Sequence, residues 1–195
     1  MASAFEGLVT AADWVRAYRQ CALLAVVSSV RDEEFIEICT DDWTSVLVLP
    51  PPVGRAVLES CPPAGPILAR PACKQLPAQW MFFTWPDQTP SEEAIIQLAV
   101  VGGFLPGPGT SVPLPTTVDP LDTEPGWVRW PSTDLPTLSE LLMSVVALPR
   151  GLFSGSRVAT DTRHLSSGAD RSLRAMLSDA EVGARALRRR GGRNA

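Results

Sequence analysis

Few side chains in this chain could act as metal ligands, nucleophiles or general bases. Paired acidic residues occur at Asp41/Asp42, Glu92/Glu93 and Asp119/Asp122. Paired carboxylates can hold divalent cations. The first pair precedes a predicted strand, where a metal site could lie, although a solvated turn is the simpler interpretation. The second pair fits the acidic first turn of a helix, and the third lies in a proline-bounded polar loop.

Other catalytic chemistries find little support in the sequence. The single histidine, His164, falls in a predicted linker, so a nucleophilic triad is not expected. The four cysteines, at positions 21, 39, 61 and 73, have no C-x-x-C spacing. We therefore expect buried free thiols and no zinc site. The glycines between Gly102 and Gly109 match neither a dinucleotide-binding loop nor a P-loop. We predict no catalytic residues, no metal site and no cofactor.

Charge is divided unevenly along the chain. Residues 1–149 carry seven basic and 17 acidic side chains, a net charge of −10, whereas residues 150–195 carry ten arginines and four acids, a net charge of +6. A basic amphipathic segment of this kind could bind a phosphate backbone or a protein partner. A solubilising tail is the alternative. The candidate contact residues are Arg185, Arg188, Arg189, Arg190 and Arg193.

Tryptophan is frequent, with six residues in 195. Trp80 and Trp85, or Trp127 and Trp130, could stack on nucleobases. Packing in the core is the simpler interpretation, because Arg129 is the only basic residue close to them in sequence.

Hydrophobic periodicity and turn residues predict the elements that would position these side chains. Helices are expected at 11–30, 53–60, 91–101 and 137–148. Strands are expected at 35–39, 45–49, 67–69, 80–85, 111–114 and 127–130. This order predicts an α+β domain over residues 1–150, with a small mixed or antiparallel sheet and flanking helices. A flexible linker over 151–168 and a basic amphipathic helix or tail over 169–195 would follow.

No segment is expected to enter a membrane. The longest apolar run near the start, Cys21–Val27, is too short to span a bilayer. Without a signal peptide pattern, a cytoplasmic location is expected.

The order of several segments between Asp42 and Pro131 resembles a known family. The segments are WTSVLVLP from Trp43, GRAVLE from Gly54, GPILARP from Gly65, WMFFTWP from Trp80, GTSVPLP from Gly109 and GWVRW from Gly126. They are similar to the N-terminal domain of actinobacterial bifunctional DNA primase/polymerases, the prim-pol branch of the archaeo-eukaryotic primase group. The resemblance implies an α/β module with an RRM-like sheet and metal-dependent nucleotidyl transfer on a DNA template.

The catalytic pattern of that family is missing here. The family has an Asp-x-Asp at the end of the strand that resembles Val46–Leu49, where this chain has Val48-Leu49-Pro50. The family has a histidine before the aromatic strand, where this chain has Trp80. Two-metal catalysis needs converging carboxylates. The first hypothesis is therefore a degenerate, non-catalytic prim-pol-like domain that acts as a binding or regulatory module.

Two alternatives remain open at this point. An active nucleotidyltransferase would need relocated metal ligands, such as Asp41 and Asp42 with Asp119 or Asp122. Alternatively, the arginine-rich tail would be the functional part, and the domain would only carry it.

Overall fold

The computed structural model of the chain describes residues 4–30, 33–60, 65–73, 76–118 and 124–149. The predicted linker and basic tail lie outside these ranges. So do several residues considered above, namely Cys61, Asp119, Asp122, His164, Arg185, Arg188, Arg189, Arg190 and Arg193. Predictions about them stay predictions.

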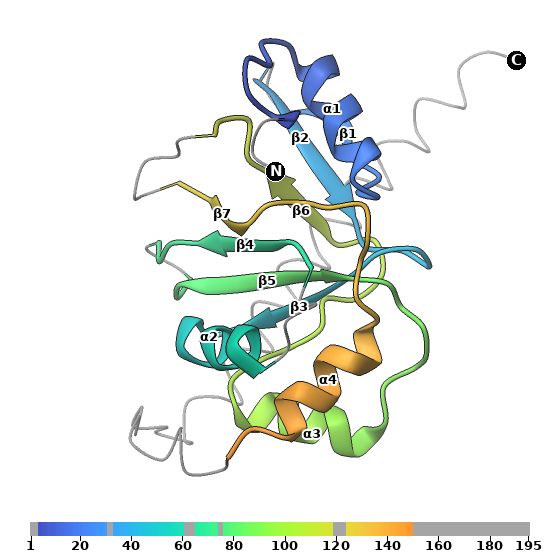
Figure 1. The fold of residues 1–195 in the computed structure, drawn as a ribbon, viewed down its shortest axis with the longest axis vertical. Helices are drawn as coiled ribbons and strands as arrows, with labels where there is room; N and C mark the ends of the chain where they lie inside the picture. Colours follow the sequence, from blue (N-terminus) through green and yellow to red (C-terminus); the bar gives the residue numbers. More distant parts are fainter. Residues whose placement is uncertain (1–3, 31–32, 61–64, 74–75, 119–123, 150–195) are drawn as a thin grey trace, which may run out of the picture. The chain divides into compact units, whose positions relative to one another are not determined.

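The described part is an α+β fold of helices and antiparallel strands, as the sequence predicts (Figure 1). The helices are α1 (Ala11–Gln20), α2 (Pro51–Ser60), α3 (Glu92–Val100) and α4 (Leu138–Val146). The strands are β1 (Val26–Val30), β2 (Glu33–Cys39), β3 (Ser45–Leu49), β4 (Ile67–Arg70), β5 (Gln79–Thr84), β6 (Ser111–Leu114) and β7 (Gly126–Arg129).

The strands form two antiparallel sheets, with orders β1-β2-β6 and β3-β5-β4-β7. In the second sheet β5 lies between β3 and β4, and helix α2 connects β3 to β4. After α3, Phe104 forms an antiparallel bridge with Val48 through two backbone hydrogen bonds of 3.0 Å. This is the split β-α-β order of ferredoxin-like sheets, with the last strand reduced to one bridge and β7 added at the other edge.

The second sheet is covered on both faces. Val46 and Val48 contribute to a core cluster with Phe83, whereas Leu47 and Leu49 point to the opposite face. All these side chains are buried. A strand that is buried on both faces needs apolar residues at consecutive positions, which explains the sequence S-V-L-V-L of β3.

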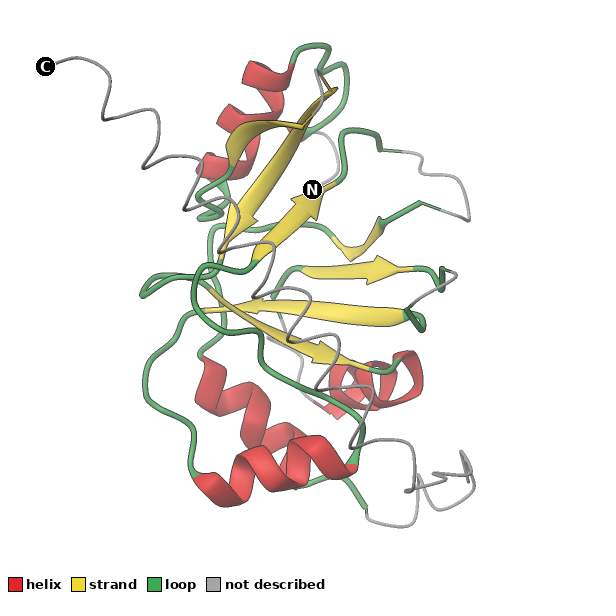
Figure 2. Cartoon of the chain, turned by 180° about the vertical axis from the view of Figure 1, so that it is seen from behind, coloured by secondary structure: helices red, strands yellow, loops and turns green. Residues whose placement is uncertain are grey.

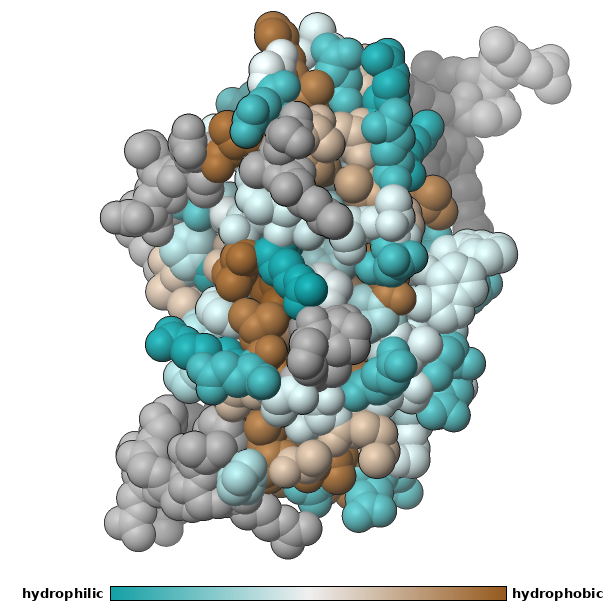
Figure 3. Space-filling view, in the orientation of Figure 1, coloured by the Kyte–Doolittle hydropathy of each residue, from teal (hydrophilic) through white to brown (hydrophobic). Residues whose placement is uncertain are grey.

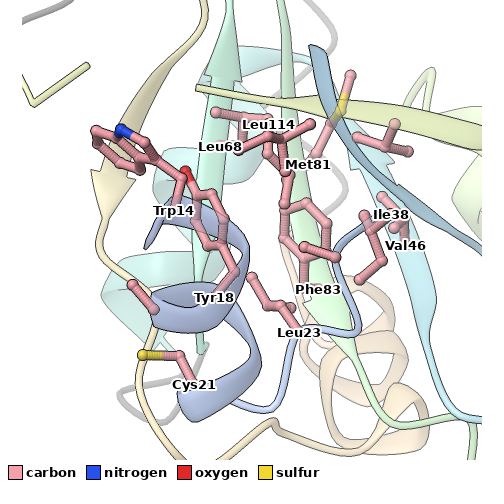
Figure 4. Close-up of a cluster of buried hydrophobic side chains, with 14 of the residues drawn as sticks. Trp14, Tyr18, Cys21, Leu23, Ile38, Val46, Leu68, Met81, Phe83 and Leu114 are labelled. Carbon is pink, nitrogen blue, oxygen red and sulfur yellow. The ribbon is translucent and has the colours of Figure 1, made fainter. Parts of the chain in front are cut away.

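Helices lie on both sides of the strand layers (Figures 1 and 2). Helices α2, α3 and α4 lie together beside the β3 end of the second sheet, whereas α1 lies with β1 and β2. Gly103 separates Leu49 from Leu98 of α3, because a Cβ there would lie 2.8 Å and 2.5 Å from their methyl groups. Figure 4 shows the core on the α1 side, where Tyr18 and Leu23 of the α1 segment belong to the same buried cluster as Phe83 and Val46 of the second sheet.

The predicted helix over 11–30 is wrong beyond residue 20. Helix α1 begins at the expected capping box of Thr10 and Asp13 but ends with Leu23 N–H donating to the Tyr18 carbonyl at 3.1 Å. Ala22 adopts φ +58°, the left-handed conformation that ends many helices. Leu23 then enters the core, and the β-branched residues that follow form β1.

Most other elements are confirmed within a few residues. Helix α2 begins at Pro51, two residues earlier than expected, because proline is well tolerated in a first helical turn. Ser91 caps α3, with Glu92 and Glu93 in its first turn, and Thr137 caps α4.

The expectation of buried thiols is confirmed only for Cys21. Cys39 and Cys73 are exposed, so the prediction is wrong for them. Cys39 ends β2 on the face opposite the buried Ile36 and Ile38, because side chains alternate along a strand.

The hydroxyl of Tyr18 is buried and hydrogen-bonded in the core, so its ionisation tests whether the core is formed as described. Its hydroxyl donates to the Pro115 carbonyl at 2.5 Å and accepts from the Trp127 indole N–H at 3.2 Å. Burial raises the pKa of Tyr18 well above its usual value, and the Trp127 bond opposes this only in part. Since the unfolded phenol has a pKa of about 10, the neutral form stabilises the fold fully below that pH. Above it, stability falls by up to about 1.4 kcal/mol per pH unit.

We therefore predict that tyrosinate absorbance near 295 nm will appear only when the protein unfolds in alkali. Tyr18 is the only tyrosine of the chain, so the signal belongs to one residue. Circular dichroism recorded on the same samples gives the unfolding transition, and Tyr18→Phe removes the absorbance change as a control. Ionisation near pH 10 in a protein that is still folded would contradict the predicted burial.

Candidate functional site

Two exposed tryptophans, Trp43 and Trp85, pack against each other at the surface. Their side chains are 58% and 40% exposed, respectively. The ring centroids lie 5.1 Å apart and the ring planes meet at 70°, an edge-to-face pair. Such a pair is a large apolar surface left in water, which is where ligands often bind.

The turn before β3 fixes the backbone of Trp43. One oxygen of Asp41, Oδ1, accepts the backbone N–H groups of Trp43 and Thr44, each at 2.8 Å, and Asp41 N–H donates to the Thr44 carbonyl at 3.0 Å. Aspartate is favoured in such turns because its side chain can accept bonds from the following backbone. The solvated turn expected at Asp41 and Asp42 is therefore present, and it holds an exposed aromatic residue.

The backbone of Trp85 is fixed at the end of β5. Its N–H donates to the Pro136 carbonyl at 2.9 Å, and its carbonyl accepts from Leu138 N–H at 2.8 Å. Pro136 packs against Gly65, which has φ +66° and whose Cβ, if added, would overlap the proline ring. Both tryptophans are thus attached to backbone that is hydrogen-bonded locally, a form of preorganisation that lowers the cost of binding.

A cavity of about 450 Å³ lies beside these rings, and we call it the tryptophan pocket. Its walls combine apolar side chains, three threonines and one carboxylate. The lining residues are Ala22, Leu24, Trp43, Thr44, Trp85, Thr133, Asp134, Leu135 and Thr137. Ala22 is the residue with positive φ, so the turn that ends α1 also shapes this wall. A second groove of about 590 Å³ shares Thr44 and is lined by Asp41, Asp42 and several prolines.

The other tryptophans are structural. Trp127 lies 6.0 Å from Tyr18 and 5.6 Å from Phe83 between ring centroids, and Trp130 lies 5.0 Å from Phe5. Trp80 packs on Gly54, where an added Cβ would lie 2.8 Å from its ring. Of the predicted stacking candidates, Trp85 is exposed, whereas Trp80, Trp127 and Trp130 are half-buried. Trp43, the partner of Trp85, was missed, although the D-D-W-T turn before a strand is a recognisable signal.

The predicted carboxylate pairs do not assemble into a metal site within the described ranges. Asp41 is engaged in its turn, and Glu92 and Glu93 occupy the first turn of α3. No group of three or more His, Cys, Asp or Glu side chains that could hold a metal ion occurs among the described residues. Asp119 and Asp122, the other proposed ligands, lie outside those ranges.

The resemblance places its catalytic residues in the segment Val48–Pro50 and at Trp80, and these positions are neighbours in the sheet. Strands β3 and β5 are neighbours, and Leu49 pairs directly with Trp80. Leu49 is fully buried, and the Pro50 carbonyl already accepts the N–H of Gly54 at 2.9 Å at the start of α2. This end of β3 is packed, whereas the tryptophan pocket lies at its other end.

Exposed apolar side chains also gather over α3 and α4. Figure 3 shows brown and tan atoms at the lower end of the molecule in that view. The residues are Ile95, Ile96, Val100, Met143 and Val146. Separately, no helix in the described ranges has the length and apolar character that crossing a bilayer requires.

Comparison with known proteins found no matching family model, no matching curated protein and no matching solved structure.

The turn at Asp41 allows a matched pair of variants. Asp41→Ala removes the acceptor of two backbone N–H groups, so we expect a loss of about 1–2 kcal/mol in the free energy of unfolding. Asp42→Ala is the control, because the Asp42 side chain is exposed and the turn hydrogen bonds among the described residues go to Asp41. Its effect on the free energy of unfolding should stay within about 0.5 kcal/mol. Urea unfolding measures both. Equal effects of the two variants would contradict the assigned role of Asp41.

Proposed function

We propose that the chain is a non-catalytic binding module on a degenerate prim-pol-like framework, and that the tryptophan pocket is its ligand site. One observation carries the proposal. The segment Val48-Leu49-Pro50 stands where the resembled family has Asp-x-Asp, and Trp80 stands where it has a histidine; the two lie on the paired strands β3 and β5, and Val48, Leu49 and Trp80 are packed against other residues. The position where metal ligands would be needed is filled by apolar side chains.

The framework part of the proposal is supported by strand order. The resemblance requires the strand at Val46–Leu49 and the aromatic strand at Trp80–Trp85 to be neighbours, and β3 pairs with β5. It also requires a small sheet with helices connecting its strands, which the β3-α2-β4-β5-α3 order supplies. A fold can host many functions, so the function has to be argued from the site.

The binding part is supported by the exposed aromatic pair. Exposed tryptophans beside a pocket are over-represented at interaction sites, because a large apolar ring gains much free energy when a partner covers it. Here the pocket is large enough for a small molecule or a side chain, and backbone hydrogen bonds hold both tryptophan positions. Residues that only complete a core would be buried instead.

The non-catalytic assignment predicts no polymerase activity. We expect the full chain, incubated with a primed DNA template, deoxynucleotides and Mg²⁺ or Mn²⁺, to give no extension product on a sequencing gel. A known polymerase under the same conditions serves as the positive control.

Template-dependent extension by the wild-type chain would overturn this proposal. The variant Asp41→Asn with Asp42→Asn would then identify the source of the activity. The amide of residue 41 can still accept the turn hydrogen bonds, so this variant removes charge while keeping the fold. Loss of extension in it would establish relocated metal ligands.

A second candidate function is binding of nucleic acid or a protein partner through the basic tail. It is favoured by the division of charge, with +6 on residues 150–195 against −10 on residues 1–149. An acidic body repels phosphate backbones, so contacts with nucleic acid would be confined to the tail, with Arg185, Arg188, Arg189, Arg190 and Arg193 as candidates.

A further inference from the structure

We propose that the tryptophan pocket binds a methylated or quaternary ammonium group, an inference that rests on the proposed binding function and names the ligand class of that site. The head group would contact the indole faces of Trp43 and Trp85 near the carboxylate of Asp134.

The geometry of the two rings suits a cation. Their planes meet at 70°, so the rings form two sides of a corner rather than a parallel slot. A parallel slot would favour a flat ring inserted by stacking, whereas a corner offers two aromatic surfaces to a rounded group. Cations are attracted to indole faces by the negative charge of the π system, and tryptophan is the strongest of the aromatic side chains in this respect.

The charges around the pocket have the complementary sign. Asp134 lines it, and Asp41 and Asp42 directly precede Trp43 in sequence. No described lysine or arginine lines the pocket. Arg19 lies in the last turn of α1, where its Nε–H donates to the Ala25 carbonyl at 3.0 Å, and it is not part of the lining. The charge at the pocket therefore disfavours an anionic ligand such as a nucleotide.

The apolar lining favours a methylated ammonium over a primary one. A primary ammonium needs three hydrogen-bond acceptors when it leaves water. Leu24 and Leu135 line the pocket beside the two indoles, and of its three threonine hydroxyls that of Thr137 is already bonded to Glu140 at 2.8 Å, so a primary ammonium would find few free acceptors besides Asp134. Methyl groups spread the charge and pack on leucine and indole surfaces, so they lose little hydration on entering such a site.

The test compares ligands of the same shape that differ in charge. The full chain, labelled with ¹⁵N in its indole groups, is titrated with choline and with 3,3-dimethylbutan-1-ol, its neutral carbon analogue, at constant ionic strength. The indole N–H signals of Trp43 and Trp85 are assigned with tryptophan-to-phenylalanine variants. We expect choline to shift both signals and to bind at least about tenfold more tightly than the neutral analogue.

Two further probes distinguish the source of the ammonium group. A short peptide containing trimethyl-lysine, compared with the same peptide containing lysine, represents a protein partner, whereas choline represents a free small molecule. A preference for the trimethylated peptide over choline assigns the site to a modified protein, and the reverse preference assigns it to a small molecule. Either result supports the ammonium class.

Variants separate the local carboxylate from the overall charge. Asp134→Asn is expected to weaken choline binding several-fold, because it removes the carboxylate that lines the pocket. Glu59→Gln on α2 removes the same charge elsewhere and should leave the affinity unchanged. Trp85→Ala should abolish measurable binding, and Trp85→Phe, which keeps an aromatic face, should restore part of it. Circular dichroism verifies that each variant is folded.

The titrations separate failure of the ammonium inference from failure of the pocket as a binding site. Equal affinity for choline and its neutral analogue, with shifts at Trp43 and Trp85, would overturn the ammonium inference and leave the pocket as a binding site. If neither probe nor either peptide shifts these two signals, the pocket itself loses its support as the ligand site, and the ammonium inference falls with it.

Discussion

The antiparallel pairing of β3 with β5 is the interaction on which the rest of the described fold depends. Both strands place alternating side chains on two faces, and both faces are buried. One face packs against α1 and the β1-β2-β6 sheet, and the other packs under α2, α3 and α4. Burial on this scale provides most of the stability of a small domain, so little polar chemistry can be accommodated within the sheet itself.

This constraint decides where function can lie. The end of β3 at Leu49 and Pro50 turns directly into α2 and has no room for hydrated ligands. The opposite end opens into the Asp41 turn, and there Trp43 meets Trp85 from the end of β5. The same strand pair therefore fills one end with packing and presents aromatic side chains at the other, and the proposed binding site is built on this arrangement.

The sequence predicted most of the elements because their signals are local. Thr10, Ser91 and Thr137 cap the helices that they were expected to begin. Ala22 was missed as a helix end because it adopts a left-handed φ without being glycine, and the β-branched residues after it were therefore assigned to the helix. Trp85 was found as a candidate, but its pairing with Trp43 depends on the register of β3 and β5, whose paired residues lie 31 to 39 positions apart along the chain. Local patterns carry no information about such contacts.

The most direct test of the account is the stability cost of removing Trp43, compared with that of removing the buried Trp14. If Trp43 is held at the surface to contact a ligand, Trp43→Ala should lower the free energy of unfolding by only about 1 kcal/mol. Trp14→Ala should cost about 3–5 kcal/mol, because it empties a core position. Both values come from urea unfolding of the full chain. A loss for Trp43→Ala as large as that for Trp14→Ala would show that Trp43 belongs to the core, and would contradict the assignment of the tryptophan pocket as the ligand site.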